Sequence, residues 1–279
     1  MESDKINRIL ENFFYKDKGN GYKKLNFLVN SGRNKLHIVL DFDRTLTKSH
    51  NKRGENISTW EILRAHLPQK AQKEYQELYN KYRPQEIRNE LKVSDAINWW
   101  ESILTLFKEN KLRWSDIAID IEKMPIRPYT KELIDVCRRK NIPTIIISAG
   151  IKDIIELFCQ KFEIVPTLIL STNLIFSPDG YIEGWERESL IHVLNKKEKG
   201  HKELNKIKRI RPNTILIGDS VDDAPMVETG ENVLRILVDD PRGDEGNRNT
   251  EVYEEILQKF DLIIKNKSLY PILRIIDLL

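Results

Sequence analysis

Three short apolar runs, each ending abruptly in polar or small residues, constrain the fold of this 279-residue chain most strongly. They are residues 35–40 before Asp41, residues 143–147 before Ser148, and residues 214–217 before Gly218. Helix-like patterns follow the second and third runs. Buried strands that alternate with helices are typical of a parallel sheet with right-handed crossovers. The sequence therefore predicts an α/β fold with its polar residues beyond the carboxyl ends of the strands, where such sheets bind ligands.

The chain between the first two runs lacks the strand signal and shows helical periodicity instead. Its expected helices are residues 57–66, 69–92, 94–110 and 115–123. We predict an α/β core of residues 1–48 and 124–279, which begins with an amphipathic helix. Residues 49–123 are predicted to form a helical cap domain inserted into this core. Residues 174–182 carry a Pro-Asp-Gly turn between apolar arms and predict a β-hairpin.

Composition excludes several classes of protein. No run of apolar side chains exceeds three residues, whereas a membrane-spanning helix needs about 20 apolar positions. The N-terminus mixes both charge signs and lacks the apolar block of a secretory signal, so we expect a cytoplasmic protein without membrane partners. A net charge of +3 does not indicate a nucleic acid polymer as partner, and we expect a monomer. Cys137 and Cys159 lack paired spacing and predict free, buried thiols.

Aspartates follow two of the predicted strands. Asp41 and Asp43 share one face if the strand geometry continues. Two negative charges so near each other require a cation. Alone, this pair would also fit the start of a turn. Asp219 and Asp223 follow another strand of the same sheet, which favours an octahedral Mg²⁺ site completed by water and a substrate phosphate. Asp222 is interpreted as a solvated neighbour or a helix cap.

Two further segments suit a phosphoryl group. Ser148, Ala149 and Gly150 join a predicted strand to a helix N-terminus, where backbone N–H groups favour an anion. The alternative is an ordinary turn with a serine cap. Lys196 would hold a phosphate against the carboxylates, or would be one of many surface lysines. His192 lies in a mostly apolar run, which favours a structural role.

These motifs, in this order, resemble the four motifs of the haloacid dehalogenase superfamily. Residues 41–46 resemble the first motif, Ser148 the second, Lys196 the third and residues 218–223 the fourth. A closer resemblance is to the cytosolic 5′-nucleotidase III family of pyrimidine 5′-nucleotidases. It rests on residues 147–151, residues 188–196, Lys81-Tyr82 and Glu86, and extends from Lys35 to the C-terminus. It implies a Rossmann-like core with a C1-type helical cap between the first two motifs.

The resemblance implies a Mg²⁺-dependent phosphatase of nucleoside 5′-monophosphates. Asp41 would attack the phosphorus and form an aspartyl-phosphate, while Asp43 would act as acid and then as base. The implied metal site takes side chains of Asp41 and Asp219, the backbone carbonyl of Asp43, and support from Asp223. Ser148 and Lys196 would grip the phosphoryl oxygens.

The resemblance also implies a base site in the cap. Glu86 would accept hydrogen bonds from a nucleobase, the alternative being a solvated helix carboxylate, and Ser102 is the nearest match to a serine of the family's base site. Trp99 and Trp100 point in different directions on a helix, so we expect one to face the cleft and the other to pack in the cap.

A tryptophan in the cleft would stack on any base and would favour a cationic one such as 7-methylguanine. The expected substrates are therefore UMP and CMP, with 7-methyl-GMP as a further candidate. The competing hypotheses are a phosphatase of another small ester, such as phosphoserine or a sugar phosphate, and a nucleotide-binding protein without catalysis.

Overall fold

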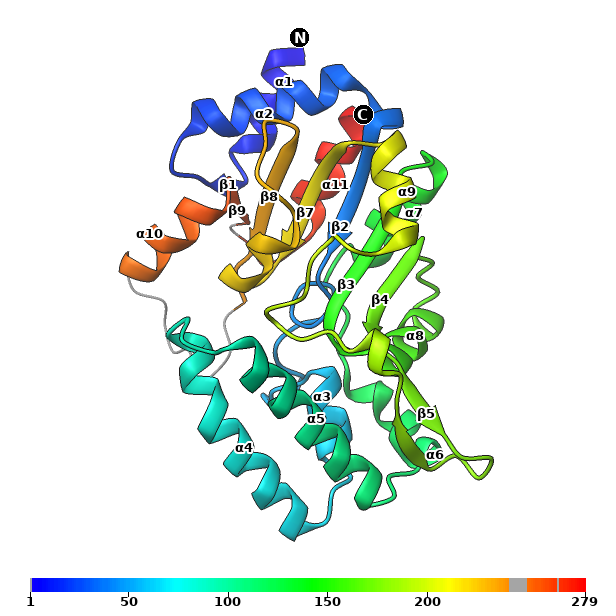
Figure 1. Ribbon diagram of the computed structural model, residues 1–279. Helices are drawn as coiled ribbons and strands as arrows, with labels where there is room; N and C mark the ends of the chain where they lie inside the picture. The colour runs from blue at the N-terminus through cyan, green and yellow to red at the C-terminus, as the bar shows by residue number, and fades with distance from the viewer. Residues whose placement is uncertain (1, 241–249, 265) are drawn as a thin grey trace.

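The computed structural model describes residues 2–240, 250–264 and 266–279, and a seven-stranded sheet lies at its centre (Figure 1). The strand order is β1-β9-β8-β7-β2-β3-β4. Every neighbouring pair is parallel except β1 and β9. The strands are β1 (Phe13–Phe14), β2 (Leu36–Leu40), β3 (Thr144–Ile151), β4 (Leu168–Thr172), β7 (Asn213–Gly218), β8 (Val233–Val238) and β9 (Leu262–Ile264). The predicted α/β fold with a mostly parallel sheet is confirmed.

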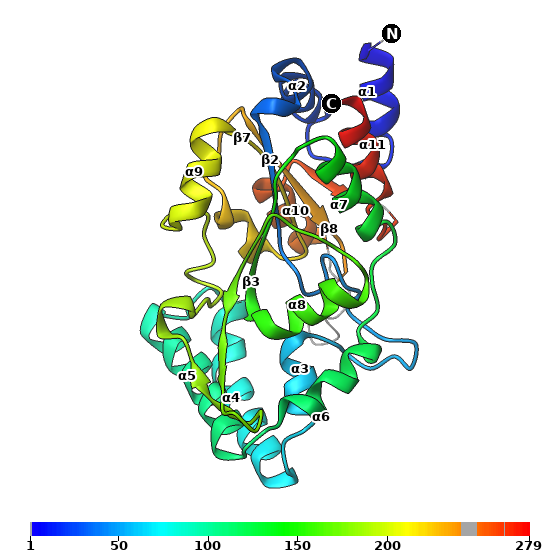
Figure 2. The same cartoon turned by 90° about the vertical axis from the view of Figure 1, so that its right-hand side faces the viewer.

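Helices cover both faces of the sheet, with α9 on one side and α7 and α11 on the other (Figure 2). Side chains alternate along a strand, so Ile38 and Leu40 of β2 pack in one apolar cluster and Val39 packs in another. Strands covered on both faces carry continuous apolar runs, as the sequence shows. The helices of the α/β core, on both faces together, are α1 (Glu2–Leu10), α2 (Lys18–Ser31), α7 (Thr130–Arg139), α8 (Lys152–Lys161), α9 (Lys202–Ile210), α10 (Thr250–Lys259) and α11 (Tyr270–Leu278).

Between β2 and β3 the chain forms a group of helices beyond the carboxyl ends of these strands (Figure 1). These are α3 (Thr59–Arg64), α4 (Gln69–Ile87), α5 (Val93–Glu109) and α6 (Trp114–Ile119). They fall in the segments expected to be helical, and α4 and α5 pack against each other. The predicted hairpin is also present, as strands β5 (Leu174–Phe176) and β6 (Ile182–Trp185). None of the described helices is long and apolar enough to cross a membrane.

Four short 3₁₀ helices complete the described elements: Arg33–Lys35, Asp120–Lys123, Arg187–Ser189 and Val221–Met226. The last one stands where the sequence indicated a helix after β7, and this expectation is corrected. Pro225 lies inside this segment and has no amide hydrogen to donate to a continuing helix. The chain therefore reaches β8 through a short turn, which keeps the residues after β7 close to the sheet edge.

Arg127 forms hydrogen bonds between the two chain segments that connect the sheet to the inserted helices, one leaving β2 and one returning to β3. Its Nε donates to the Thr45 carbonyl at 2.8 Å and its Nη2 to Asp240 Oδ2 at 2.7 Å. Asp240 also accepts from the backbone N and the Oγ of Ser49, at 3.0 and 2.9 Å. Arg127 is 1% exposed, so these bonds are shielded from water. The outgoing and returning segments are thereby held to each other and to Asp240, which follows β8.

Asp240→Asn is expected to lower the free energy of unfolding by about 3 kcal/mol near neutral pH, because it leaves the buried Arg127 charge uncompensated. Burial opposes ionisation, but the charge and hydrogen bond of Arg127 outweigh it and hold the pKa of Asp240 below its ordinary value of 3.8. The folded form therefore gains stability above that value and loses it as the pH falls through the lowered pKa. Urea unfolding of both proteins at pH values from about 7 down to about 3 measures this difference.

The difference between the two proteins should shrink in the acid range. Asp239→Asn is the matched control, since Asp239 is the neighbouring residue and accepts a hydrogen bond from the Tyr253 hydroxyl. We expect it to cost less than about 1 kcal/mol. An equal loss in both variants, or a difference independent of pH, would contradict the role given to the Arg127–Asp240 pair.

Candidate active site

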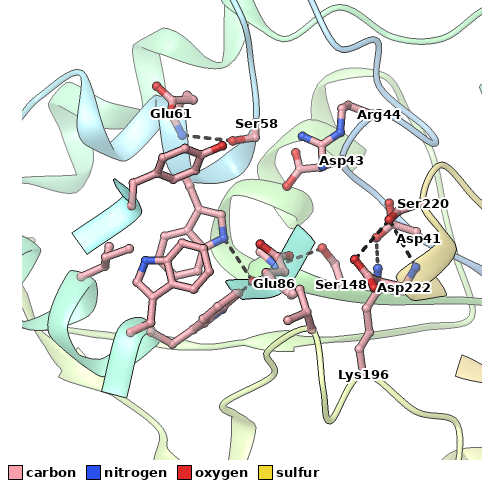
Figure 3. Close-up of a pocket in the computed structure, with 18 of the residues that line it drawn as sticks. Asp41, Asp43, Arg44, Ser58, Glu61, Glu86, Ser148, Lys196, Ser220 and Asp222 are labelled. Carbon is pink, nitrogen blue, oxygen red and sulfur yellow. Dashed lines mark hydrogen bonds and ion pairs between the residues drawn. The ribbon is translucent and has the colours of Figure 1, made fainter. Parts of the chain in front are cut away.

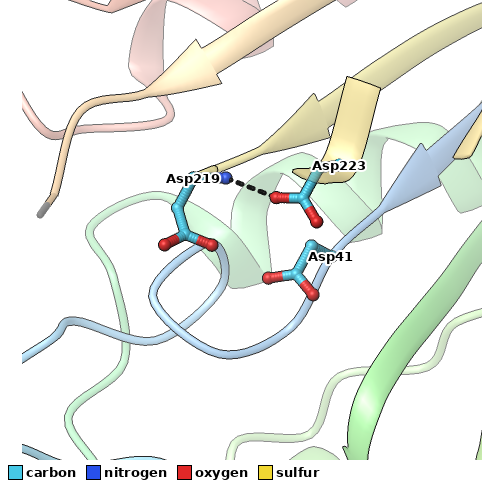
Figure 4. Close-up of side chains that lie close together, drawn as sticks. All are labelled: Asp41, Asp219 and Asp223. Atoms are coloured by element: carbon cyan, nitrogen blue, oxygen red, sulfur yellow. Dashed lines mark hydrogen bonds between the residues drawn. The ribbon is translucent and has the colours of Figure 1, made fainter. Parts of the chain in front are cut away.

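Three aspartates meet at the carboxyl end of the sheet. Asp41 follows β2 and Asp219 follows β7, and these strands are neighbours. One carboxylate oxygen from each of Asp41, Asp219 and Asp223 lies within 4.8 Å of the others (Figure 4). All three are buried. The structure therefore brings together three of the four predicted metal ligands, in the donor set that Mg²⁺ prefers.

The loop after β7 fixes Asp223 through its own backbone. Asp223 Oδ2 accepts hydrogen bonds from the backbone N of Asp219 at 2.9 Å (Figure 4) and of Ser220 at 3.1 Å. A side chain at Gly218 would not fit, because its Cβ would lie 2.4 Å from Asp223 Oδ2. Asp222 lines the cavity but stays outside the three-carboxylate group. Asp223 is thus held rigidly, as a residue that supports a metal shell requires.

Lys196 lies between two of the carboxylates. Its Nζ donates to Asp41 Oδ1 and, at 2.7 Å, to Asp223 Oδ1. Burial opposes the ammonium charge, but the two carboxylates outweigh it and raise the pKa of Lys196. Lys196 is 6% exposed and therefore is not one of the surface lysines. The structure brings it to the acidic cluster, where it carries a positive charge.

The surroundings of the Asp41 carboxyl group raise its pKa. Burial, with the neighbouring charges of Asp223 and Asp219, raises the pKa of Asp41 to about 8, although Lys196 opposes the shift. A bound cation would lower this pKa by stabilising the carboxylate. A metal ion in the cluster would therefore favour an ionised Asp41 at neutral pH.

Asp43 lies beside the cluster rather than in it. Its Oδ1 accepts from the Thr59 backbone N at 3.0 Å and its Oδ2 from Thr59 Oγ1 at 2.9 Å. Burial raises the pKa of Asp43, while Arg44 and the Thr59 bonds oppose the rise. A carboxyl group with a raised pKa, displaced from the metal position, suits a general acid. The structure does not bring the Asp43 side chain to the other predicted ligands.

The segment from Ser148 to Gly150 differs from its predicted form. Strand β3 continues to Ile151, with an irregular register against β4, so these residues are strand rather than a turn into a helix. Ser148 Oγ accepts from the Gly150 N at 3.1 Å. At Gly150 a Cβ would lie 2.3 Å from Thr59 Oγ1, so only glycine lets Thr59 approach Asp43 here. All three residues line the same cavity as the acidic cluster.

The cavity beside the cluster measures about 310 Å³, within the size range of small-molecule sites. Asp41 and Lys196 lie at one side of it, and Ser58 and Glu61 lie at the other (Figure 3). Helices α3, α4 and α5 supply an aromatic wall made of Trp60, Tyr75, Tyr79, Trp99 and Trp100. The cavity thus joins a charged end that suits a phosphate to an aromatic end that suits a flat ring.

The predicted residues of the inserted helices reach this cavity with one exception. Glu86 is 6% exposed and forms an ion pair with Arg83 Nη1 at 2.8 Å, so it is not a solvated carboxylate. Trp99 and Trp100 both line the cavity, which corrects the expectation that one of them faces away. Trp100 Nε1 donates to the Ala149 carbonyl at 3.0 Å.

Ser102 is the exception. It lines a separate groove between α4 and α5 that also contains Lys81 and Thr105. Ser102 is not among the residues that line the cavity, although Trp99 and Trp100 of the same helix are. The expectation that Ser102 contacts the substrate is corrected accordingly.

Three residues expected to be structural, His192, Cys137 and Cys159, are buried. His192 is 1% exposed, its Nδ1 accepts from the Leu194 backbone N at 3.2 Å, and burial lowers its pKa. Cys137 and Cys159 are free and buried, as predicted. Burial raises the pKa of both thiols to about 12, which leaves them inert as nucleophiles.

Comparison with known proteins identifies the family. The model of the pyrimidine 5′-nucleotidase family UMPH-1 matches residues 44–277, which is most of the chain. The chain belongs to the pyrimidine 5′-nucleotidase family. The family and its named relatives are 5′-nucleotidases, a class of phosphoric monoester hydrolases. The predicted resemblance is thereby confirmed.

Two relatives are 7-methylguanosine phosphate-specific 5′-nucleotidases. The protein from Rattus norvegicus is 28% identical over 87% of this chain and 86% of its own length. The protein from Drosophila melanogaster is 29% identical over 76% of this chain and 71% of its own length. Among solved structures, cytosolic 5′-nucleotidase IIIB bound to cytidine is 26% identical, with a TM-score of 0.79, and covers 96% of this chain and 92% of that one.

A more distant likeness shows the fold alone. A substrate-bound phosphoserine phosphatase is 17% identical, with a TM-score of 0.55, over 86% of this chain and 97% of that one. This structural likeness agrees with the haloacid dehalogenase type of fold that the four motifs indicated.

Three residues of the nucleotidase site were not found from the sequence. Thr59 bonds Asp43, Trp60 Nε1 donates to the Ala149 carbonyl at 3.1 Å, and Arg44 pairs with Asp219. The first two have a visible signal, because Ser58 and Glu61 form the S-x-x-E pattern of a helix start and Ser58 Oγ accepts from the Glu61 N. That pattern places Thr59 and Trp60 in the first turn of α3, but their direction depends on how α3 packs against β3.

Proposed function

We propose that this member of the pyrimidine 5′-nucleotidase family hydrolyses nucleoside 5′-monophosphates with Mg²⁺, through a phosphorylated Asp41. The observation that carries the proposal is the shared cavity, in which the acidic cluster with Lys196 lies at one end and aromatic side chains lie at the other. A nucleoside monophosphate has this same distribution of a charged phosphate and a flat base.

In the first half-reaction Asp41 attacks the phosphorus, and an O–P bond to Asp41 forms as the bond to the 5′-oxygen breaks. Asp43 gives its proton to the leaving 5′-oxygen. In the second half-reaction Asp43 takes a proton from water, which attacks the phosphorus and releases phosphate and the free Asp41 carboxylate. Ser148 and Lys196 bind the phosphoryl oxygens during both steps.

The residues present fit a magnesium ion, because carboxylates at the end of a sheet are hard oxygen donors. Asp41 and Asp219 would hold the ion by their side chains and Asp43 by its backbone carbonyl, with Asp223 in support. The ion supplies positive charge that offsets the carboxylates and the phosphoryl oxygens.

For the base we propose a preference for UMP and CMP. Aromatic residues of the cavity would stack on the ring, and Glu86 would accept hydrogen bonds from its edge. The Arg83–Glu86 ion pair offsets the negative charge that a cationic base would need, which favours a neutral pyrimidine. The second candidate is 7-methyl-GMP, supported by the names of the relatives and by the tryptophans in the cavity.

Phosphate release from a substrate panel tests this function. The panel contains UMP, CMP, 7-methyl-GMP, AMP, GMP, phosphoserine and a sugar phosphate, each with Mg²⁺, with EDTA, and with Mg²⁺ restored after EDTA. We expect turnover concentrated on the first three compounds, lost by at least about 100-fold in EDTA and recovered with Mg²⁺. Turnover only of phosphoserine or sugar phosphates would contradict the substrate assignment, and binding without turnover would contradict the enzymatic one.

Glu86→Gln is expected to separate base recognition from phosphate chemistry. The change keeps the shape of the side chain but removes its charge and one acceptor, so kcat/KM for CMP should fall by about 10- to 100-fold. For p-nitrophenyl phosphate, which carries no nucleobase, kcat/KM should stay within about threefold. Glu90→Gln is the matched control, because Glu90 is exposed and pairs with Arg88. Equal losses on both substrates would show that Glu86 does not read the base.

A further inference from the structure

Arg44 is a positively charged residue inside the first aspartate motif, and its backbone is locked in place. Its φ of 64° lies in the left-handed region, which few residues other than glycine adopt. Its N donates to Thr47 Oγ1 at 2.8 Å, and its carbonyl accepts from Arg127 Nη2. These bonds determine where the side chain leaves the loop.

The Arg44 side chain enters the active-site cavity. Its Nε donates to Asp219 Oδ2 at 2.9 Å, and the side chain is 8% exposed. Its guanidinium group lies beside the Asp43 carboxylate, where its charge opposes the rise of the Asp43 pKa that burial causes (Figure 3). Arg44 thus reaches both the acidic cluster and the proposed general acid.

Most of the hydrogen-bonding capacity of Arg44 is unused. A guanidinium has five N–H donors, of which the Nε–H bonds Asp219. Within the described ranges, 2–240, 250–264 and 266–279, no hydrogen bond from Nη1 or Nη2 is found, and neither atom is sealed from the cavity. Lys196 by contrast already donates to Asp41 and Asp223. An ammonium has three N–H donors, so Lys196 keeps one, whereas Arg44 keeps four. Among the described residues of the acidic cluster, Arg44 is therefore the cation with the most unused donors.

Charge explains why such donors are needed. With Asp43 protonated as the proposed general acid, the carboxylates of Asp41, Asp219 and Asp223 face Lys196 and Arg44, so the site carries a formal excess of one negative charge before a divalent ion binds. A phosphate dianion that enters next brings two more negative charges into a buried place, where unpaired charge is costly. Planar guanidinium groups bind phosphate oxygens through two parallel hydrogen bonds.

We propose that Arg44 binds the phosphoryl group of the substrate directly through its Nη atoms, in addition to holding Asp219. This inference rests on the proposed function, since it assumes that a phosphoryl group occupies the cavity. Arg44 is then a substrate-binding residue that helps to stabilise the charge of the transferring group, beside Ser148 and Lys196.

Binding of inorganic phosphate, measured by isothermal titration calorimetry, tests the proposal without relying on turnover. The proteins are the wild type, Arg44→Gln and Arg44→Lys. Each is first titrated with Mg²⁺ alone, and phosphate is then titrated at a Mg²⁺ concentration that saturates that protein. We expect the dissociation constant for phosphate to rise about tenfold to hundredfold in Arg44→Gln, and less in Arg44→Lys.

Lys48→Gln is the matched control, because Lys48 is four residues away on the same segment and exposed, so its loss removes one charge outside the cavity. Its phosphate affinity should stay within about twofold of the wild type. Equal affinity of Arg44→Gln and wild type at saturating Mg²⁺ would show that Arg44 acts only through Asp219, and would overturn this inference alone. A wild type that does not bind phosphate would overturn the proposed function together with it. Circular dichroism of each variant shows whether it is folded.

Discussion

Asp41→Asn is expected to lower nucleotide hydrolysis by a factor on the order of 10⁴ or more, because an amide cannot form the covalent intermediate. The position is set by β2, which delivers Asp41 into the cluster with Asp219 and Asp223. The variant should still fold and bind nucleotide, since Asn has nearly the same shape. Phosphate release from CMP and binding of CMP, both with Mg²⁺, measure the two effects.

The stability of this variant gives an independent check. Because the pKa of Asp41 is raised to about 8, the metal-free wild type loses stability as the pH rises from about 4 towards 8. Asp41→Asn removes that cost, so in EDTA near pH 8 its free energy of unfolding should not be lower than that of the wild type. Asp222→Asn, a neutralised carboxylate outside the cluster, should lose less than about tenfold in turnover. Comparable losses in both variants would contradict the assignment of Asp41.

Lys196→Met is expected to lower kcat/KM by about 10³-fold, since it removes the cation that lies between Asp41 and Asp223. It should also lower the free energy of unfolding in EDTA by about 3 to 5 kcal/mol, because two buried carboxylates are left uncompensated. Mg²⁺ should restore part of this stability by supplying the missing charge. Urea unfolding with and without Mg²⁺ measures the effect.

The neighbouring Lys197 provides the control for that prediction. Lys197 is exposed, and Lys197→Met removes the same charge one residue away. Its turnover and stability should remain close to those of the wild type. If Lys196→Met behaved like Lys197→Met, the ion pairs of Lys196 would have no role in catalysis or stability.

The sheet and its acidic end follow closely from local sequence patterns. Strands such as β2 and β7 are covered on both faces, so they require the continuous apolar runs by which they are found. Asp41 and Asp219 could be placed together because parallel neighbouring strands end at one edge. Lys196 could not be placed by such reasoning, since it reaches Asp41 from 155 positions away. Its assignment required the order of the family motifs.

The aromatic wall is the part that local patterns could not supply. Helical periodicity finds α4 and α5, but the rotation of a helix about its own axis depends on packing against distant elements. This rotation brings Trp99 and Trp100 into the cavity together and turns Ser102 into another groove. The contact of Thr59 with Asp43 likewise depends on the approach of α3 to Gly150.

Detection of a phosphoryl group on Asp41 tests the central claim most directly. The wild type is mixed with CMP and Mg²⁺, quenched in acid within the first turnover, digested, and analysed by mass spectrometry. We expect the peptide that contains Asp41 to gain the mass of one phosphoryl group, and expect no such gain in Asp41→Asn. Rapid hydrolysis without a phosphorylated Asp41, or with the phosphoryl group on another residue, would contradict the proposed mechanism.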